Sequence, residues 1–583
     1  MEICTGMLKN EMREMRLELE EKIKAAKGEI PFDKLFIHAN IINTYTGKII
    51  RDASVGIKKG VIVSVCPRFD ASAKEIVDCE GMYMTPSFID AHMHIESSRL
   101  HPLAYAQGAV PHGTGCIMTD PMQLVNASGE KGFLAFVRML KTMPMRAYIQ
   151  FPSRVPATEG MEHSGADFSP EDTARLMQTE GVLTLGEVNA YDLSKESTLQ
   201  KMAYAHSLGK MMNGHCPGLG RDAIMGAASA GLRDDHESET FEELMERLNA
   251  GMSVMIREGT IEPNCSTLVK GVVQNQISTS ELMFCTDDKS PEDIAANGCI
   301  DNCVRIAISE GLAPIEAIKM ATINPAKHFH IEDKMGVIAP GRYADFLLLK
   351  DLEHVAIESV FFGGEKIAEH GKALFSFTPV REEALLQSIH LPENLEEEDI
   401  CPDCFSAAIE MLPGSLLTRK ISGCTKPDID KDILPISVID RYTGEKHVGT
   451  ALIKGLGIKR GAVASSCAQE GNNIVVSGTN RRDMLLAVKE IQRIGGGNVV
   501  CIDGKIVGTR CFPIGGIVSD KSLWEELEAI RRFNEALKLT GSENPILMAA
   551  LTVSLCPSIP EIGLTDMGII ENGVLINGVN NNE

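Results

Sequence analysis

Eight strand-like apolar runs between residues 82 and 327 constrain the fold of this chain more than any other feature of its sequence. Helical periodicity separates most of these runs, and that alternation predicts βα units around a parallel sheet. Eight units in roughly 245 residues are typical of an α/β protein with a (β/α)8 TIM-like barrel. The predicted strands are Met84–His94, Gly115–Asp120, Ala147–Pro152, Val182–Glu187, Lys210–His215, Leu232–His236, Ser253–Glu258 and Leu282–Asp287, with helices such as Glu130–Lys141, Pro170–Gln178 and Phe241–Asn249 between them.

Side chains that commonly bind metals stand at the ends of several predicted strands. His92 and His94 are two residues apart, so a strand would point both imidazoles to the same side. Since barrel enzymes build their active sites at the C-terminal strand ends, residues from different strands would meet there. Each residue alone is more often an ordinary polar strand end, but together they indicate a metal centre. The set is His92, His94, Glu187, His215, His236 and Asp287.

The six side chains fit a binuclear site in which two histidines hold each metal. The first pair comes from the first predicted strand, and the second pair from the fifth and sixth. Glu187 could bridge the metals through its two oxygens, and Asp287 could contact a metal and its bound water. The six side chains predict two divalent ions per chain, and imidazole and carboxylate ligands accept Mn, Fe, Zn and Co alike. A metal lowers the pKa of its bound water from 15.7 to about 7, which predicts hydrolysis near neutral pH.

Changes of pattern on both sides of the predicted barrel divide the rest of the chain. Short alternating strands before and after the barrel predict one small β-sandwich domain built from both flanks. An acidic segment with two prolines is interpreted as a linker. The expected parts are an N-terminal helical arm (1–30), a composite β-domain (31–81 plus 336–385), the barrel (82–335), the linker (386–405) and a C-terminal α/β domain (406–583).

Two shorter motifs are interpreted without a catalytic role. Cys401 and Cys404 have the spacing of half a zinc site, but no second pair follows nearby, so a metal there is not expected. Three glycines, 495–497, follow a predicted helix at Arg482–Ile494. They do not match a phosphate-binding fingerprint, so we interpret them as a turn.

Net charge and apolar patterning restrict the partners of this chain. A net charge of −23 disfavours nucleic-acid binding, where phosphates must be neutralised by Lys and Arg. No apolar run reaches membrane-spanning length, and the N-terminus lacks a signal-peptide pattern. Sixteen cysteines in such a chain are typical of reduced thiols. We therefore expect a cytoplasmic protein with a small-molecule substrate and neither a nucleic-acid nor a membrane partner. A homo-oligomer is also expected, because barrels with such C-terminal domains often assemble.

Longer segments resemble a known family. FIDAHMHIESS, LGEVNAYD, NGHCPGL, DDHES and FCTDDKSPED are similar to segments of the adenine deaminases of the amidohydrolase superfamily. PSRVPATEGMEHSGA, GVIAPGRYAD, VVSGTNRRDM and IPEIGLTDMG extend this likeness over nearly the whole chain after the first thirty residues. The resemblance implies a C-terminal domain particular to this branch and a two-metal centre, commonly of iron or manganese, on the same six ligands. It also implies hydrolysis of adenine to hypoxanthine and ammonia by a metal-bridging hydroxide that attacks C6.

The resemblance suggests further roles for acidic residues. Asp287 would take the proton of the hydroxide and pass it to the leaving nitrogen, acting first as base and then as acid. Glu96, Asp288 or Glu258 could orient the purine or protonate N1, although acidic residues near strand ends often only cap the next helix.

Three loops depart from the family pattern and leave the substrate open. Histidines of the family pattern are absent from this chain in each loop, and none of these positions is an expected metal ligand. The departing segments are Asp120-Pro121-Met122-Gln123, Gly298-Cys299-Ile300-Asp301 and Gln469-Glu470-Gly471-Asn472. The alternative is hydrolysis of a different purine or cyclic amide, such as ring opening of xanthine. A catalytically silent structural member would lack a metal ligand, and none is missing.

Overall fold

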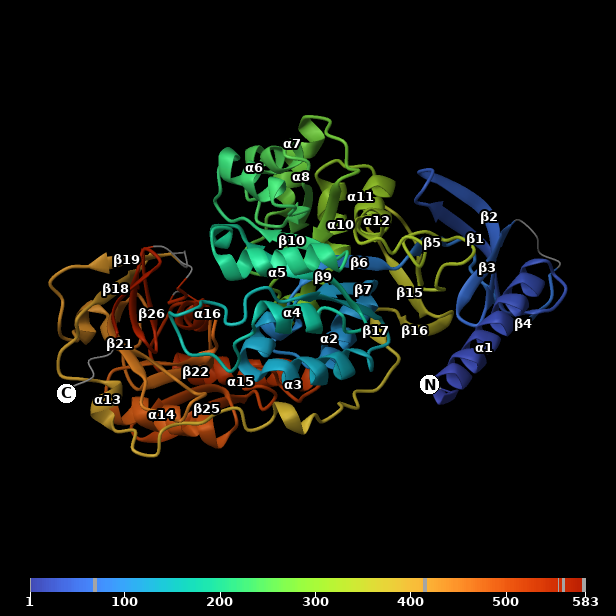
Figure 1. Cartoon of the computed structure of the whole chain (residues 1–583). Helices are drawn as coiled ribbons and strands as arrows, with labels where there is room; N and C mark the ends of the chain where they lie inside the picture. The colour runs from blue at the N-terminus through green and yellow to red at the C-terminus, as the bar shows by residue number, and fades with distance from the viewer. Residues whose placement is uncertain (1, 67–70, 413–416, 554, 558–560, 579–583) are drawn as a thin grey trace.

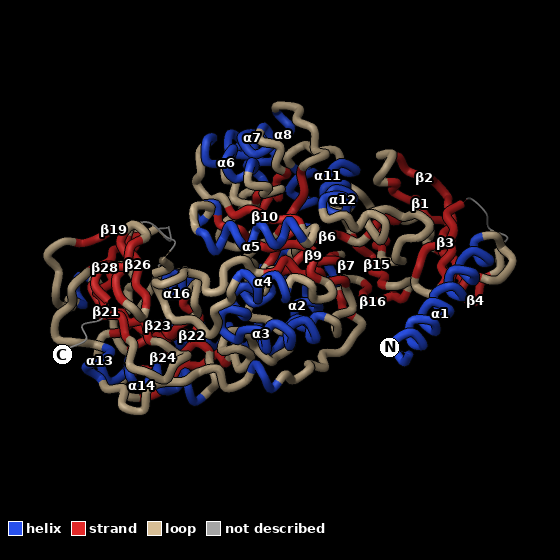
Figure 2. Tube along the Cα trace, viewed as in Figure 1, coloured by secondary structure: helices blue, strands red, loops and turns tan. Residues whose placement is uncertain are grey.

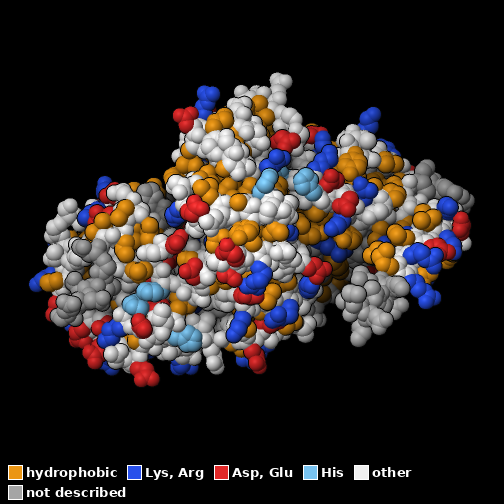
Figure 3. Space-filling view, in the orientation of Figure 1, with side chains coloured by type: hydrophobic (Ala, Val, Ile, Leu, Met, Phe, Trp, Pro, Cys, Tyr) orange, Lys and Arg blue, Asp and Glu red, His pale blue; other side chains and the backbone are white. Residues whose placement is uncertain are grey.

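The computed structural model describes residues 2–66, 71–412, 417–553, 555–557 and 561–578. Figure 1 shows three regions in a row, with the N-terminal strands and helix α1 (Glu2–Ala26) at one end, parallel strands and their helices in the middle, and the C-terminal sheet at the other end. Acidic and basic side chains are interspersed on the face shown in Figure 3. Within the described ranges, none of the helices has the length and apolar character that a membrane crossing requires.

Eight parallel strands form the middle region, divided between two sheets. The larger sheet has the order β10-β9-β8-β7-β6, and the smaller one has the order β11-β12-β13. Isolated parallel bridges join them at both junctions, Met212 with Leu232 and Met93 with Asp287. The strands are β6 (Phe88–Met93), β7 (Thr114–Thr119), β8 (Arg146–Phe151), β9 (Val182–Asn189), β10 (Met211–His215), β11 (Asp234–Asp235), β12 (Ser253–Arg257) and β13 (Leu282–Cys285).

These strands follow the predicted order, with two differences. The first predicted strand is divided at Ser87 into β5 (Tyr83–Pro86) and β6, because β5 pairs with the N-terminal sheet instead. The sixth predicted strand, Leu232–His236, is reduced to the two residues of β11. The carboxylates of these two residues accept hydrogen bonds from backbone N–H groups at the end of β10. Asp234 binds Gly214 N at 3.2 Å and Asp235 binds Cys216 N at 3.0 Å.

Helices alternate with the parallel strands along the chain (Figure 2). The helix at 241–249 begins with a capping box between Thr240 and Glu243, which satisfies two backbone N–H groups at its start. Helix α3 begins at Met122, and Gly129, at φ 61°, divides it into two parts, of which the second begins at the predicted Glu130. The helices are α2 (Pro102–Ala109), α3 (Met122–Leu140), α4 (Pro170–Leu176), α5 (Glu196–Ser207), α6 (Arg221–Ser229), α7 (Phe241–Asn249), α8 (Cys265–Gln274), α9 (Pro291–Asn297), α10 (Ile300–Ser309), α11 (Pro314–Met320) and α12 (Ile323–His328).

One nine-stranded sheet unites the two flanks of the middle region. β14 (Phe346–Leu349) runs antiparallel to β5, so segments far apart in sequence share one hydrogen-bonded ladder. The strands of the predicted sandwich thus belong to one hydrogen-bonded path. Its curvature brings the rings of Phe36, Phe346 and Phe361 within 5.1 Å of one another. Its remaining strands are β1 (Phe32–Asn43), β2 (Lys48–Lys58), β3 (Val61–Cys66), β4 (Ala73–Asp78), β15 (Ile357–Phe362), β16 (Glu365–Glu369) and β17 (Lys372–Ala373).

The C-terminal region contains an eight-stranded sheet with the order β19-β18-β21-β20-β23-β22-β24-β25. Helix α15 (Leu523–Lys538) packs on β25 and on helices α2 and α9, which ties this region to the middle one. The other elements are β18 (Ala408–Met411), β19 (Thr418–Ile421), β20 (Ile433–Ile439), β21 (Val448–Lys454), β22 (Ala462–Ala468), β23 (Asn473–Gly478), α14 (Arg481–Arg493), β24 (Gly497–Ile502), β25 (Lys505–Cys511), α16 (Leu547–Val553), β26 (Ile562–Thr565), β27 (Gly568–Glu571) and β28 (Val574–Gly578).

The segment 386–405, expected to be a linker, packs into the C-terminal core. Ile389, Leu395 and Ile400 are buried with residues of β20 and α14. Acidic residues lie beside Leu395 and Ile400 in the sequence, which made the segment look like an exposed linker. Cys401 is buried and Cys404 is exposed, and among the described residues no group that could hold a metal contains a cysteine.

Candidate metal centre

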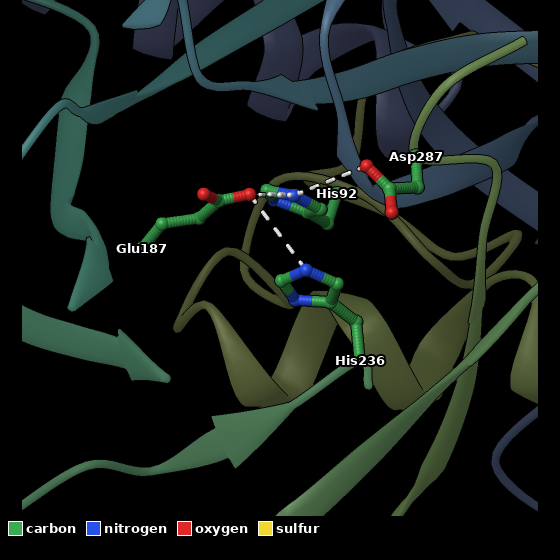
Figure 4. A group of neighbouring side chains, drawn as sticks. All are labelled: His92, Glu187, His236 and Asp287. Atoms are coloured by element: carbon green, nitrogen blue, oxygen red, sulfur yellow. Dashed lines mark hydrogen bonds and ion pairs between the residues drawn. The ribbon is translucent and has the colours of Figure 1, made fainter. Parts of the chain in front are cut away.

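Four of the predicted ligands form one buried group at the carboxyl ends of the parallel strands. His92 lies on β6, Glu187 on β9, His236 after β11 and Asp287 after β13, and their ligand atoms lie within 4.8 Å of one another (Figure 4). Glu187 Oε1 is 3.0 Å from His92 Nε2, 2.9 Å from His94 Nε2 and 3.7 Å from His236 Nε2. One carboxylate oxygen thus faces three imidazoles.

Partners outside the group orient the first two imidazoles. His92 Nδ1 lies 2.6 Å from Gln150 Oε1, and His94 Nδ1 lies 2.8 Å from the Asp120 carbonyl oxygen. Both partners accept hydrogen bonds, so each Nδ1 donates its proton to them and each Nε2 faces the centre. Gln150 lies on β8, next to β7 and β9.

A second group joins His215 and His236 with Glu237. Glu237 Oε1 is 3.2 Å from His215 Nδ1 and 3.2 Å from His236 Nε2. Neither of these buried nitrogens makes a hydrogen bond within the described part of the chain. Buried polar atoms normally have a partner, so these nitrogens fit coordination of a divalent metal. The sequence interpretation missed Glu237, although it follows His236 directly in the DDHES segment.

Asp287 adopts a left-handed conformation at φ 52° and is held by backbone and side-chain contacts. Its N–H donates to the His92 carbonyl at 3.0 Å, and its Oδ1 lies 3.5 Å from His94 Nε2. Burial alone would raise the pKa of Asp287, but Arg257 and the nearby imidazoles lower it. Asp287 is therefore an anion beside the imidazoles.

The other acidic candidates occupy different places. Asp288 lines the cavity above the centre, and burial together with Asp287 raises its pKa. Glu96 is buried and accepts the Gln123 N–H at 3.2 Å, and burial raises its pKa to about 7. Glu258 accepts the N–H of Cys265 at the start of α8 and does not line the cavity. Of these three, Asp288 is placed to reach a ligand.

Asp120 is a further buried acid that the sequence interpretation did not select. Neither of its carboxylate oxygens has a hydrogen-bond partner among the described residues. Burial and repulsion from Glu187 raise the pKa of Asp120 to about 8. Asp120 ends a predicted strand, and that position could have marked it in the sequence as a candidate for the site.

A cavity of about 940 Å³ opens over the two groups. Met122 and Gln123 line it, as do Gln469 and Glu470 of the C-terminal region. Two of the three segments that depart from the family pattern thus face the cavity. Cys299 does not, because it is fully buried elsewhere.

Two arginines that the sequence interpretation missed also border the cavity. Arg257 Nη1 lies 3.0 Å from Asp287 Oδ2 and 3.0 Å from Glu237 Oε1. Arg154 Nη2 lies 2.8 Å from Glu187 Oε2. Each cation neutralises carboxylates of the centre, and buried charges require such pairing.

The sequence is similar to known proteins in both of its larger parts. Residues 83–367 match the Amidohydrolase family, and residues 416–573 match the Adenine deaminase C-terminal domain. The chain is 37% identical over 567 residues to an adenine deaminase of Desulforamulus reducens, covering 95% of this chain and 96% of that protein. It is 34% identical over 566 residues to adenine deaminase 2 of Carboxydothermus hydrogenoformans, covering 95% and 98%. A solved adenosine deaminase from Xanthomonas campestris with bound zinc aligns with a TM-score of 0.44 at 14% identity, over 60% of this chain and 95% of that chain.

Proposed function

Because the chain belongs to the adenine deaminase family, we propose that it hydrolyses adenine at C6 to give hypoxanthine and ammonia. The observation that carries the proposal is the meeting of His92, Glu187, His236 and Asp287 at the strand ends, beside a cavity lined by both larger regions. Hydrolytic sites of α/β proteins with parallel strands lie at those ends.

The centre holds two divalent metal ions per chain in this proposal, with manganese or iron preferred and zinc or cobalt as alternatives. The orphaned nitrogens of His215 and His236 and the shared oxygen of Glu187 support it. The first metal would contact His92 and His94, and the second would contact the other two histidines. When bound, the metals supply a water whose pKa falls from 15.7 to about 7.

The middle region is proposed to be one closed (β/α)8 barrel at 82–335. The single bridges at both junctions between the parallel sheets support closure. The composite β-domain (31–81 plus 336–385) and the C-terminal domain (406–583) would then be attached parts. The N-terminal arm, a homo-oligomeric assembly and a cytoplasmic location stay predictions.

Asp287 and Asp288 are the proposed proton-transfer residues. Asp287 Oδ1 faces the imidazoles and would accept the proton of the attacking water. As the new C6–O bond forms and the C6–N6 bond breaks, the same oxygen would deliver that proton to the departing ammonia. Asp288 lines the cavity and would protonate N1, and it would regain a proton when the second proton of the attacking water leaves as the C6=O bond forms. Glu96 accepts the Gln123 N–H and would orient the cavity wall.

Ammonia release tests this function directly. Protein reconstituted separately with Mn(II) and Fe(II) is incubated with adenine, guanine and xanthine, and both ammonia and the purine product are measured. We expect hypoxanthine and ammonia in equal amounts from adenine. A much faster reaction with another ring, such as ring opening of xanthine, would contradict adenine as the substrate. That alternative is kept because Met122, Gln123 and Gln469 line the cavity where the family pattern differs.

A further inference from the structure

The guanidinium of Arg154 lies between two carboxylates from different regions of the chain. Its Nη2 is 2.8 Å from Glu187 Oε2, and its Nη1 is 2.9 Å from Glu470 Oε2. Glu187 belongs to β9 and to the candidate metal centre, whereas Glu470 lies in the loop between β22 and β23. One cation therefore connects the C-terminal region to the carboxylate proposed to bridge the metals.

Backbone contacts hold both ends of this connection. The Ser153 hydroxyl donates to the Glu187 carbonyl at 2.7 Å, so the loop that carries Arg154 also binds β9. The Asn472 side chain donates to the Glu470 carbonyl at 2.9 Å, which fixes the turn on the other side. The side chains of Arg154 and Glu470 are 7% and 13% exposed. The arginine is thus placed by both regions.

The two oxygens of Glu187 have separate partners. Oε1 lies 3.0 Å from His92 Nε2 and 2.9 Å from His94 Nε2, while Oε2 accepts from Arg154. A buried carboxylate turns about its last bond unless partners fix it, and a charge-assisted hydrogen bond fixes it strongly. Arg154 therefore fixes the plane of the Glu187 carboxylate, whose Oε2 also lies 4.0 Å from His215 Nδ1.

A cation this close to a metal-binding carboxylate also opposes metal binding. At short range and with little water, repulsion between a guanidinium and a metal ion is strong unless an anion balances it. Glu470 supplies that anion. We infer that Glu470 is a positioning residue that acts through Arg154 to orient Glu187 and to balance charge for metal binding. The inference rests on the proposed function and gives the C-terminal region a part in the metal centre.

Metal affinity tests this role without any measurement of turnover. Metal-free protein is titrated with Mn(II) by equilibrium dialysis, and far-UV circular dichroism confirms that each variant is folded. We expect Glu470→Gln to weaken Mn(II) binding about 10- to 100-fold, as outer partners of metal ligands usually do. Glu470→Asp keeps the charge one methylene further away and should lose less. The matched control is Glu159→Gln, since Glu159 lines the same cavity but contacts Ser197.

A double-mutant cycle separates this role from general stabilisation of the fold. With Arg154→Met as the background, Glu470→Gln should change Mn(II) affinity by less than about twofold, because no guanidinium remains to be balanced. Unchanged affinity in Glu470→Gln alone, or an equal loss in both backgrounds, would overturn the inference. If Glu470→Gln does not fold, Glu470→Asp replaces it in the same cycle, and its loss of Mn(II) affinity is compared between the wild-type and Arg154→Met backgrounds. Wild-type protein that binds Mn(II) without deaminating adenine would contradict the proposed function alone.

Discussion

Arg257 donates a hydrogen bond to Asp287 across 3.0 Å, from Nη1 to Oδ2. The same nitrogen lies 3.0 Å from Glu237 Oε1 and 2.8 Å from Glu262 Oε2, and the arginine side chain is 2% exposed. Three carboxylates therefore share one buried cation. Because Asp287 and Glu237 belong to the two candidate metal groups, Arg257 stabilises this side of the centre in metal-free protein.

Arg257→Met should lower the thermal unfolding midpoint of metal-free protein. Removal of one partner from a buried ion pair leaves uncompensated charge, which costs about 3–5 kcal/mol. Added Mn(II) should restore part of the midpoint, because a cation that binds only the folded state stabilises it. Circular dichroism melts with and without Mn(II) provide the measurement. Arg233→Met at an exposed position is the control, and equal midpoints for Arg257→Met and wild type would remove this role.

His92→Ala and His215→Ala should each lower the metal content of purified protein by about one ion per chain. Each variant removes an imidazole from a different half of the proposed binuclear site, and adenine turnover should fall to background in both. Inductively coupled plasma mass spectrometry measures the metal. His354→Ala is the control, since that side chain is 82% exposed. Full activity of wild-type protein with only one metal per chain would contradict a binuclear centre.

The local sequence pattern was enough to predict the candidate metal ligands but not the residues that hold those ligands in place. His92, Glu187 and Asp287 each end an apolar run, and the βα alternation places such ends together. Gln150 and Arg257 sit inside predicted strands, where nothing in the sequence marks them. Their roles depend on which strands are neighbours in space, and a single sequence does not contain that information.

Outside the parallel strands, too, the sequence did not indicate which segments are neighbours in space. The β5–β14 ladder pairs Pro86 with Phe346 across a long stretch of chain, so the sequence predicted short strands but not one continuous sheet. The segment 386–405 was interpreted as a linker because acidic residues lie close to buried Leu395 and Ile400 in the sequence. The acidic composition of the segment as a whole gave no indication of the apolar positions that pack on α14.

The contact between His163 and Asp566 should make stability depend on pH. The hydrogen bond to Asp566 raises the pKa of His163 above 6.5 although burial opposes it, and Asp440 and Glu445 add attraction. The His163 ring also stacks on His447, with 4.2 Å between centroids. A raised histidine pKa gives stability that is complete below the unfolded-state pKa and is lost as pH rises through the folded-state pKa.

His163→Asn should therefore lower the unfolding midpoint more at about pH 6 than at about pH 8.5, because only the protonated imidazole adds charge attraction to its hydrogen bond with Asp566. Thermal melts of wild type and variant across this range provide the measurement, with exposed His354→Asn as the control. A difference between wild type and His163→Asn that stays constant with pH would mean that the pair contributes packing alone.

Gln469 and Cys299 should respond differently to histidine, although both depart from the family pattern. Gln469 lines the cavity, whereas Cys299 is fully buried with its sulfur 3.9 Å from the Tyr105 hydroxyl. Cys299→His adds volume to a closed core, so we expect a stability loss of about 1–3 kcal/mol without a change in adenine kcat/KM per folded enzyme. Gln469→His should keep or raise adenine kcat/KM and leave the unfolding midpoint unchanged. Steady-state kinetics and thermal melts measure both effects, with Gln200→His at an exposed position as the control. Loss of adenine turnover in Gln469→His, together with faster reaction of wild type on another purine, would show that the cavity is built for a different ring.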